Sequence, residues 1–225
     1  MKRSFQCAFG TAALLLSSSA WAQDFSAKGQ LAISAERLFG FYHDSATTTA
    51  GGVENTVKSD SFSLLSSPIP LAGQANWSYG SPRVAGDYFV IDHLSVGAAL
   101  GYSHISLSVP GGGNTTVSTS GDSFLFAPRV GYAVAFNDIV GIWPRGGFTY
   151  RTLSAGNGSA HDLALTLEVP FVFCVIPHVA FWGGPTLDLG LSGGVSTTNG
   201  GRTVTNDFSS TEIGIQTGLV AYFDL

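Results

Sequence analysis

Few residues of this chain have types and spacing suited to catalysis, and the best-spaced pair is His104 and Ser106. Residues two apart on a β-strand project from the same face, so an imidazole there could activate the serine hydroxyl as a nucleophile. Such a site also needs a carboxylate that orients the histidine. The nearest following acid is Asp122, across a glycine-rich connection. The sequence therefore favours two polar residues at a strand end over a catalytic pair.

The other reactive groups lack the partners that chemistry requires. Cys174 stands in an apolar stretch without a neighbouring histidine, which favours a structural thiol over a reactive one. The five histidines show no spacing with a cysteine that is typical of a metal site. The glycines at 111–113 do not lead from a strand into a helix, so they form no phosphate-binding loop. We therefore expect no catalytic residues, no metal and no cofactor.

Charged side chains are scarce. They make up 11% of the residues, with a formal net charge of −5, whereas soluble domains contain about 25%. After the N-terminal region the lysines are Lys28 and Lys58. An acidic chain of this kind lacks the basic surface that nucleic acid requires, so we exclude nucleic acid as a partner.

The scarce charges share one face of the predicted strands. Residues 129–150 alternate between an apolar set and a set of glycine, alanine and isolated arginines. If the turn at 136–138 has three residues, Arg129 stands directly opposite Arg145, and carboxylates from other strands must neutralise both. Arg37 falls in the apolar set and needs a bulge or a position near the outer rim. The network that we predict on the small-residue face consists of Glu36, Arg83, Asp87, Arg129, Arg145, Glu168, Asp188 and Glu212.

Alternating runs predict eight strands, at 29–41, 81–91, 94–106, 122–135, 139–152, 161–173, 178–190 and 209–223. Short connections at 92–93, 136–138 and 174–177 alternate with longer ones at 42–80, 107–121, 153–160 and 191–208. This alternation is typical of an all-β, antiparallel up-and-down transmembrane β-barrel with short periplasmic turns and long outer loops. Side chains fill the interior of an eight-stranded barrel, so the apolar face meets lipid, the charged face lines the lumen, and we expect no general porin.

Aromatic residues concentrate near both ends of these strands, as expected for belts at two membrane interfaces. Near the short turns they are Tyr88, Phe89, Phe136, Trp143, Phe173, Phe181, Trp182 and Tyr222. Near the long connections they are Phe39, Phe41, Tyr42, Tyr102, Phe124 and Tyr150.

The N-terminus predicts export. Lys2 and Arg3 precede an apolar stretch at 8–16 and a small-residue cleavage site at 20–22. Residues 1–22 are therefore expected to be a cleaved signal peptide, and residues 23–225 one barrel domain. Cys7 leaves with the signal, so no internal disulfide can form. An even strand count places both termini in the periplasm.

Three passages carry a family resemblance: "RVAGDYFVIDHLSVGAALGYS" (83–103), "FAPRVGYAVAFNDIVGIWPRGGFTY" (126–150) and "TEIGIQTGLVAYFDL" (211–225). In them the chain resembles the small eight-stranded outer-membrane barrels, the outer-membrane protein A-type and X-type superfamily. The resemblance implies a place in the cell outer membrane, contact with its lipid, and insertion by the barrel-assembly machinery. The C-terminal assembly strand would present Leu219, Ala221, Phe223 and Leu225, although the family's signal usually ends in an aromatic residue.

The function expected from this resemblance is a structural or surface-interaction role, in which the long outer loops meet an extracellular ligand or surface. One alternative is a lipid A-modifying hydrolase, because some similar barrels remove lipid A acyl chains with a histidine, a serine and a glutamate. His104 and Ser106 would then be its candidate residues. A second alternative is a soluble secreted lipocalin-type barrel, whose water-exposed face would here be too poor in lysine and glutamate.

Overall fold

The computed structural model describes residues 25–65, 78–110 and 116–225, so the predicted signal peptide at 1–22 lies outside the described residues. No helix in these ranges is long and apolar enough to cross a membrane. The strands are β1 (Gln30–Ala50), β2 (Val53–Leu64), β3 (Arg83–Ile91), β4 (Leu94–Pro110), β5 (Thr116–Tyr132), β6 (Val134–Ala135), β7 (Val140–Ile142), β8 (Arg145–Ala155), β9 (Gly158–Glu168), β10 (Phe171–Ile176), β11 (Val179–Asn199) and β12 (Arg202–Asp224).

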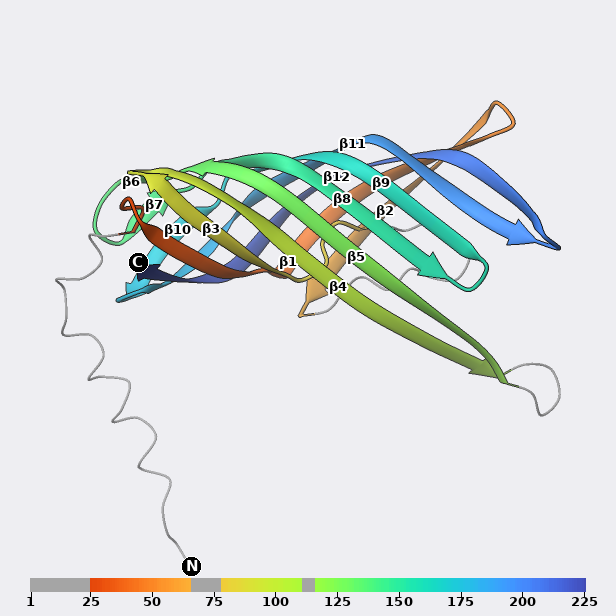
Figure 1. Cartoon of the computed structure of the whole chain (residues 1–225), viewed down its shortest axis with the longest axis horizontal. Helices are drawn as coiled ribbons and strands as arrows, with labels where there is room; N and C mark the ends of the chain where they lie inside the picture. The colour runs from red at the N-terminus through yellow and green to blue at the C-terminus, as the bar shows by residue number, and fades with distance from the viewer. Residues whose placement is uncertain (1–24, 66–77, 111–115) are drawn as a thin grey trace, which may run out of the picture.

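These strands form one sheet that closes on itself, because β12 pairs with both β11 and β1 (Figure 1). The twelve segments make eight barrel strands, since four barrel strands are divided in two. β3 pairs with the first part of β1 and β2 with the second part. Short interruptions separate β7 from β8 at Pro144 and β9 from β10 at Pro170, where proline has no N–H for the ladder. The predicted closed, eight-stranded antiparallel barrel is confirmed.

The outer wall of the barrel is apolar and the inner wall is polar. On β12, Ile213 and Ile215 are 56% and 62% exposed, whereas Glu212 and Gln216 on alternate positions are buried inside. Successive strand side chains point to opposite faces, so one alternating sequence supplies both surfaces. The lipocalin-type alternative required the apolar face to point inward, and the structure places it outward.

The strands continue into most of the described residues that were expected to form the longer connections. β1 continues to Ala50 and returns as β2 after a turn at Gly51 and Gly52, whose φ angles are 58° and 83°. β11 and β12 are joined in the same way at Gly200 and Gly201, with φ angles of 58° and 80°. Positive φ at both turn residues suits a two-residue hairpin. Together with β4–β5 and β8–β9, these hairpins extend from one end of the barrel, and the C-terminus lies at the other end (Figure 1).

Hydroxyl-bearing side chains make these extensions regular. Thr47 and Thr56 face each other across β1 and β2 with their oxygens 2.9 Å apart, and Ser196 and Thr205 do the same across β11 and β12 at 2.8 Å. Threonine favours strands, and cross-strand hydroxyl pairs stabilise a ladder. Segments rich in serine and threonine therefore form strands here, not coils.

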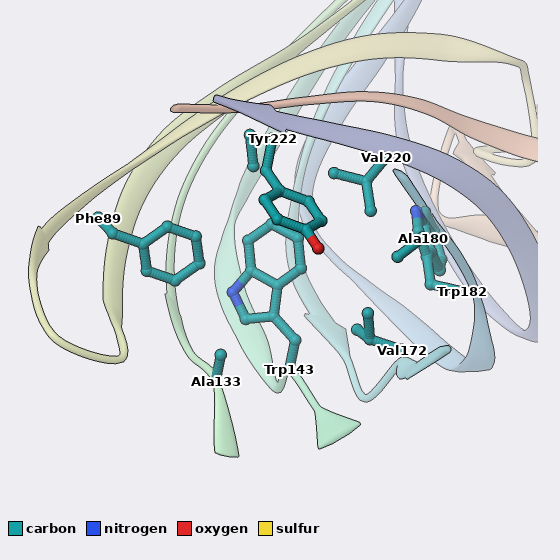
Figure 2. Packing of buried hydrophobic residues seen from close by; sticks show 9 residues of the cluster. Phe89, Ala133, Trp143, Val172, Ala180, Trp182, Val220 and Tyr222 are labelled. Carbon is teal, nitrogen blue, oxygen red and sulfur yellow. The ribbon is translucent and has the colours of Figure 1, made fainter. Parts of the chain in front are cut away.

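The predicted aromatic belts are correct only in part. Tyr88, Phe136 and Phe173 are exposed on the outer wall near the short turns, as expected. Phe89, Trp143, Trp182 and Tyr222, by contrast, are fully buried and belong to one cluster inside the barrel (Figure 2). At the opposite end Tyr42 is also buried. These rings lie at inward-facing positions of the strands. The prediction considered how close each aromatic residue is to a strand end and not which face it occupies.

Candidate functional site

A β-bulge in β1 sets up the interior of the barrel. The register with β12 steps from Ala35–Leu219 to Phe39–Thr217, so β1 carries extra residues there. Arg37 adopts a positive φ of 54°, and both Glu36 and Arg37 are fully buried. Consecutive strand residues normally face opposite sides, but a bulge re-aims a side chain. The bulge is therefore how Arg37, the exception to the alternation, reaches the lumen.

Glu36 is the centre of the network in the half of the lumen that lies nearer the short turns and the C-terminus. One of its oxygens accepts hydrogen bonds from Arg83 Nε at 2.8 Å and Arg129 Nη1 at 2.7 Å. The other accepts from Arg129 Nη2 and Arg145 Nη1, both at 2.8 Å. A single carboxylate thus binds three guanidinium groups that come from three different barrel strands.

Two more carboxylates complete this half of the network. Glu168 lies 2.8 Å from Arg145 Nη2, contacts Arg83, and accepts a hydrogen bond from Gln216 Nε2 at 2.9 Å. Asp87 accepts two hydrogen bonds from Arg129, at 2.5 and 3.0 Å. Three buried carboxylates therefore face three buried guanidiniums, and this pairing is the condition under which buried charges are tolerated.

The expected pairing of Arg129 directly opposite Arg145 was wrong. In the observed register Arg129 faces Gly147, and Arg145 faces Gly131 on one side and Glu168 on the other. The chain between them forms a separate β6–β7 hairpin, which the three-residue turn did not anticipate. The two arginines therefore lie at different positions along the barrel axis, and both donate to Glu36.

The half of the lumen nearer the long hairpins, called the outer half below, contains Arg37, Arg151 and four carboxylates. The carboxylates are those of Asp44, Asp162, Asp188 and Glu212. Arg37 Nη2 lies 3.0 Å from Asp188, and its Nη1 lies 3.5 Å from Glu212. Arg151 donates to Asp162 from Nε at 3.1 Å and from Nη2 at 3.0 Å. Of the eight residues predicted for the network, all are buried, and Asp188 and Glu212 belong to this outer group.

A segment that the sequence placed in an outer loop lies inside the barrel. Tyr79 is fully buried, its N–H donates to Glu212 at 2.8 Å, and its carbonyl accepts from Arg37 Nη1 at 2.6 Å. The phenol hydroxyl donates to Asp162, and Arg151 lies 4.0 Å from the centre of the ring. Tyr79 and the serine before it sit in a polar, glycine-rich stretch, so no periodic pattern could reveal this position.

Aromatic rings close the end of the lumen opposite the long hairpins. Phe25 makes edge-to-face contacts with Phe89, Trp143 and Tyr222, at centroid distances of 5.6, 5.4 and 5.3 Å. Figure 2 shows the three partner rings pointing into the barrel from different strands. Above them the guanidinium of Arg145 lies between the rings of Trp143 and Trp182, at 4.8 and 4.7 Å. Cation–π contacts of this kind join the aromatic layer to the charge network.

The candidate catalytic residues lie on the β4–β5 hairpin. His104 faces Asp122 directly, and its Nδ1 lies 2.8 Å from the carboxylate. Hydrogen bonds from His104 and then from Tyr102 hold the pKa of Asp122 below its ordinary value. Ser106 belongs to the next cross-strand pair on that face, opposite Ser120. Although Asp122 follows His104 across a glycine-rich connection in the sequence, β4 and β5 pair directly and bring the two side chains together.

The remaining candidate residues lie on the outer wall or beside the aromatic cluster. Leu219, Phe223 and Leu225 are exposed on the outer wall, and Ala221 shares their face. Cys174 is partly buried beside the aromatic cluster. Within the described ranges, no three histidine, cysteine, aspartate or glutamate side chains are grouped to hold a metal ion.

Comparison with known proteins shows a likeness of structure without a likeness of sequence. No family model matches the chain, and no curated protein matches its sequence. The crystal structure of the outer membrane protein OprG from Pseudomonas aeruginosa superposes with a TM-score of 0.55 at 10% identity, covering 89% of this chain and 99% of that one. The solid-state NMR structure of the outer membrane protein AlkL in lipid bilayers also gives 0.55 at 10% identity, covering 100% and 98%. By fold, the chain is a small eight-stranded outer-membrane β-barrel.

Proposed function

We propose that this chain is an integral outer-membrane protein whose filled barrel anchors protruding β-hairpins that bind an extracellular ligand or surface. The observation that carries the proposal is the combination of an apolar outer wall, an ion-paired interior and long polar hairpins at one end. The filled interior serves as a rigid base, and the hairpins supply the exposed surface.

The filled interior is the argument against a general pore. Arginines and carboxylates contact one another across the bore, the aromatic cluster closes one end, and Tyr79 occupies the other half. Opening a water-filled path would separate several buried ion pairs, and each broken pair typically costs about 3–5 kcal/mol. A planar-bilayer recording of the purified protein at neutral pH should show no porin-sized conductance, and stable large openings would refute a closed lumen.

Location follows from the outer wall. An exposed apolar surface of this extent requires lipid, so we expect the protein to remain in the membrane fraction and to need detergent for extraction. We further propose cleavage after residue 22, which N-terminal sequencing of the extracted protein should show as a start at Gln23. The exposed alternate residues Leu219 and Phe223 would be read by the assembly machinery during insertion. Release by salt or alkali without detergent would contradict membrane integration.

The hairpins are the proposed binding surface. Their side chains are polar and hydroxyl-rich, and ladder hydrogen bonds hold them in one shape, so binding would not require a loop to be ordered first. Shortening the β1–β2 hairpin by removing 47–56, with a two-residue turn joining the cross-strand partners Ala46 and Val57, should abolish adhesion of expressing cells to the host surface or matrix that they bind, without preventing barrel assembly. Shortening the β11–β12 hairpin in the same way is the matched comparison. Adhesion that survives both deletions would contradict the proposed role.

A second candidate function is supported by one observation, the hydrogen bond between His104 and Asp122. A carboxylate on Nδ1 leaves Nε2 as the base that a serine nucleophile needs, and Ser106 stands two residues along the same face. The same cross-strand bond recurs at His43 and Asp60, 2.7 Å apart, which favours a structural role for both pairs. We expect the mass of lipid A to be unchanged by the wild type; a loss of acyl chains that Ser106→Ala abolishes would establish the hydrolase instead.

A further inference from the structure

Three carboxylates stand side by side in one row across the inner wall of the barrel. Asp44 on β1 faces Glu212 on β12, and Glu212 in turn faces Asp188 on β11. All three side chains are buried. Residues directly opposite in antiparallel strands have Cβ atoms about 4.5–5.5 Å apart, and like charges at that distance destabilise the pairing. The row therefore needs compensating positive charge or a proton.

The surrounding elements do not supply enough positive charge. β1 contributes Arg37, which is also shared with Glu168, and β8 contributes Arg151, which is bound to Asp162 on β9. Thr166 on β9 gives Asp188 a neutral hydrogen bond of 2.5 Å. Two guanidiniums thus face Asp44, Asp162, Asp188 and Glu212, whereas the half around Glu36 has three of each sign. Of the remaining neighbours, Tyr42 and Tyr79 bring no positive charge, and His43, which precedes Asp44 on β1, is exposed and lies 2.7 Å from Asp60.

A proton resolves this imbalance. Asp44 and Glu212 stand directly opposite each other and both are buried, and two such carboxyl groups can share a hydrogen bond only when one of them carries a proton. One oxygen of Glu212 already accepts from Tyr79 N–H at 2.8 Å and from Ser78 Oγ at 2.6 Å. The other faces Arg37 at 3.5 Å. Both oxygens of Glu212 therefore face donors, and the proton belongs to the Asp44–Glu212 pair as a whole.

The same glutamate holds the segment that fills the outer lumen. Ser78 and Tyr79 are bound by Glu212, and the carbonyl of Tyr79 is bound by Arg37, so the row of acids and the buried segment form one unit. Loss of the proton would place two adjacent carboxylates beside Asp188. The repulsion falls on Glu212, whose displacement breaks both of its hydrogen bonds to the segment.

We propose that a proton shared by Asp44 and Glu212 latches the Tyr79 segment inside the barrel, and that the latch opens as the pH rises. This inference rests on the closed lumen proposed above. The folded barrel keeps the proton at pH values where a solvated carboxyl has lost it. The stabilisation is therefore present at low pH and disappears as the pH rises through the value at which the pair ionises.

The test is urea unfolding in detergent between pH 5 and pH 10, comparing the wild type with Asp44→Asn. The asparagine amide donates to Glu212 at every pH, so the variant should lack this pH dependence. Between the pH at which a solvated carboxyl ionises and the pH at which the pair ionises, the folded-to-unfolded ratio of the wild type should fall, relative to the variant, by up to about tenfold per pH unit, and it should level off above that range.

Two further variants keep the result interpretable. Glu212→Gln can donate to Asp44 and still accept from Tyr79, so it should also remove the pH dependence if Asp44→Asn does not fold. Tyr79→Phe loses only the hydroxyl and should lower stability by a similar amount at every pH. Parallel pH curves for the wild type and both amide variants would overturn the latch.

Bilayer recordings separate this result from the proposed function. A closed wild type at neutral pH that opens transiently at alkaline pH, with Asp44→Asn closed throughout, supports both. A wild type closed at all pH values refutes the latch alone. Large openings at neutral pH refute the closed lumen itself.

Discussion

Replacing Glu36 by glutamine is the most direct test of the charge network. The substitution preserves the shape of the side chain and removes the charge that Arg83, Arg129 and Arg145 share. Four hydrogen bonds of 2.7–2.8 Å to guanidinium groups are affected, and the glutamine amide places two donors against these donors. The half of the lumen around position 36 then has three guanidiniums and two carboxylates.

The expected loss is large because an uncompensated buried charge remains. Removing one member of a buried pair typically costs about 3–5 kcal/mol. This lowers the folded-to-unfolded ratio by roughly a hundred- to several-thousand-fold. With an m-value of about 2 kcal/mol/M, the urea midpoint should fall by about 1.5–2.5 M. Folded and unfolded barrels can be quantified by their different gel mobility after equilibration in detergent and urea.

A matched control and a rescue separate charge from general damage. Glu54→Gln changes an exposed glutamate on β2 and should shift stability by less than about 0.5 kcal/mol. Adding Arg145→Leu to Glu36→Gln restores two charges of each sign, so the double variant should lose less than the sum of the single variants. A Glu36→Gln protein as stable as the Glu54→Gln control would refute the reasoning, since Glu36 could not then be the central counter-ion.

The remaining predictions concern the topology of the barrel, two glycines of its wall and the aromatic cluster at the end opposite the long hairpins. A peptide tag inserted after Gly51 should be accessible on intact cells and one after Asp92 should not, and equal labelling of both would contradict the orientation. Gly147→Ala should destabilise the barrel, because its new methyl group would overlap the carbonyl oxygen of Pro128, whereas Gly86→Ala has open space and should be tolerated in the same urea assay. Phe25→Ala removes three edge-to-face contacts and should lower the free energy of unfolding by about 3–5 kcal/mol. Unchanged stability would show that Phe25 does not help to close the end of the barrel opposite the long hairpins.

Local patterns in the sequence carried much of the fold. Alternation of period two depends only on neighbouring residues, so the strands and their two faces could be read from stretches such as 129–150. The positions of acids and arginines on the small-residue face followed from the same pattern. The low share of charged residues pointed the same way, because a surface that faces lipid has few charges.

Features that depend on pairing across the barrel were not accessible in this way. His104 contacts Asp122 because β4 and β5 pair directly. The serine- and threonine-rich composition of this part of the chain had predicted a loop instead. The inward direction of Trp143 and Trp182 depended on the register of strands near Pro144 and Pro170, where the alternation is interrupted.

The sequence alone determined that this protein is an antiparallel barrel with an apolar outside and a charged inside, because side-chain alternation is a property of the strand itself. Only the tertiary structure decided which charges meet. The β1 bulge turns Arg37 inward, closure of the sheet brings Glu36 to three arginines of other strands, and the Tyr79 segment folds back into the lumen. These contacts join residues far apart in the chain, and their partners are fixed by register and barrel closure, for which no local pattern exists.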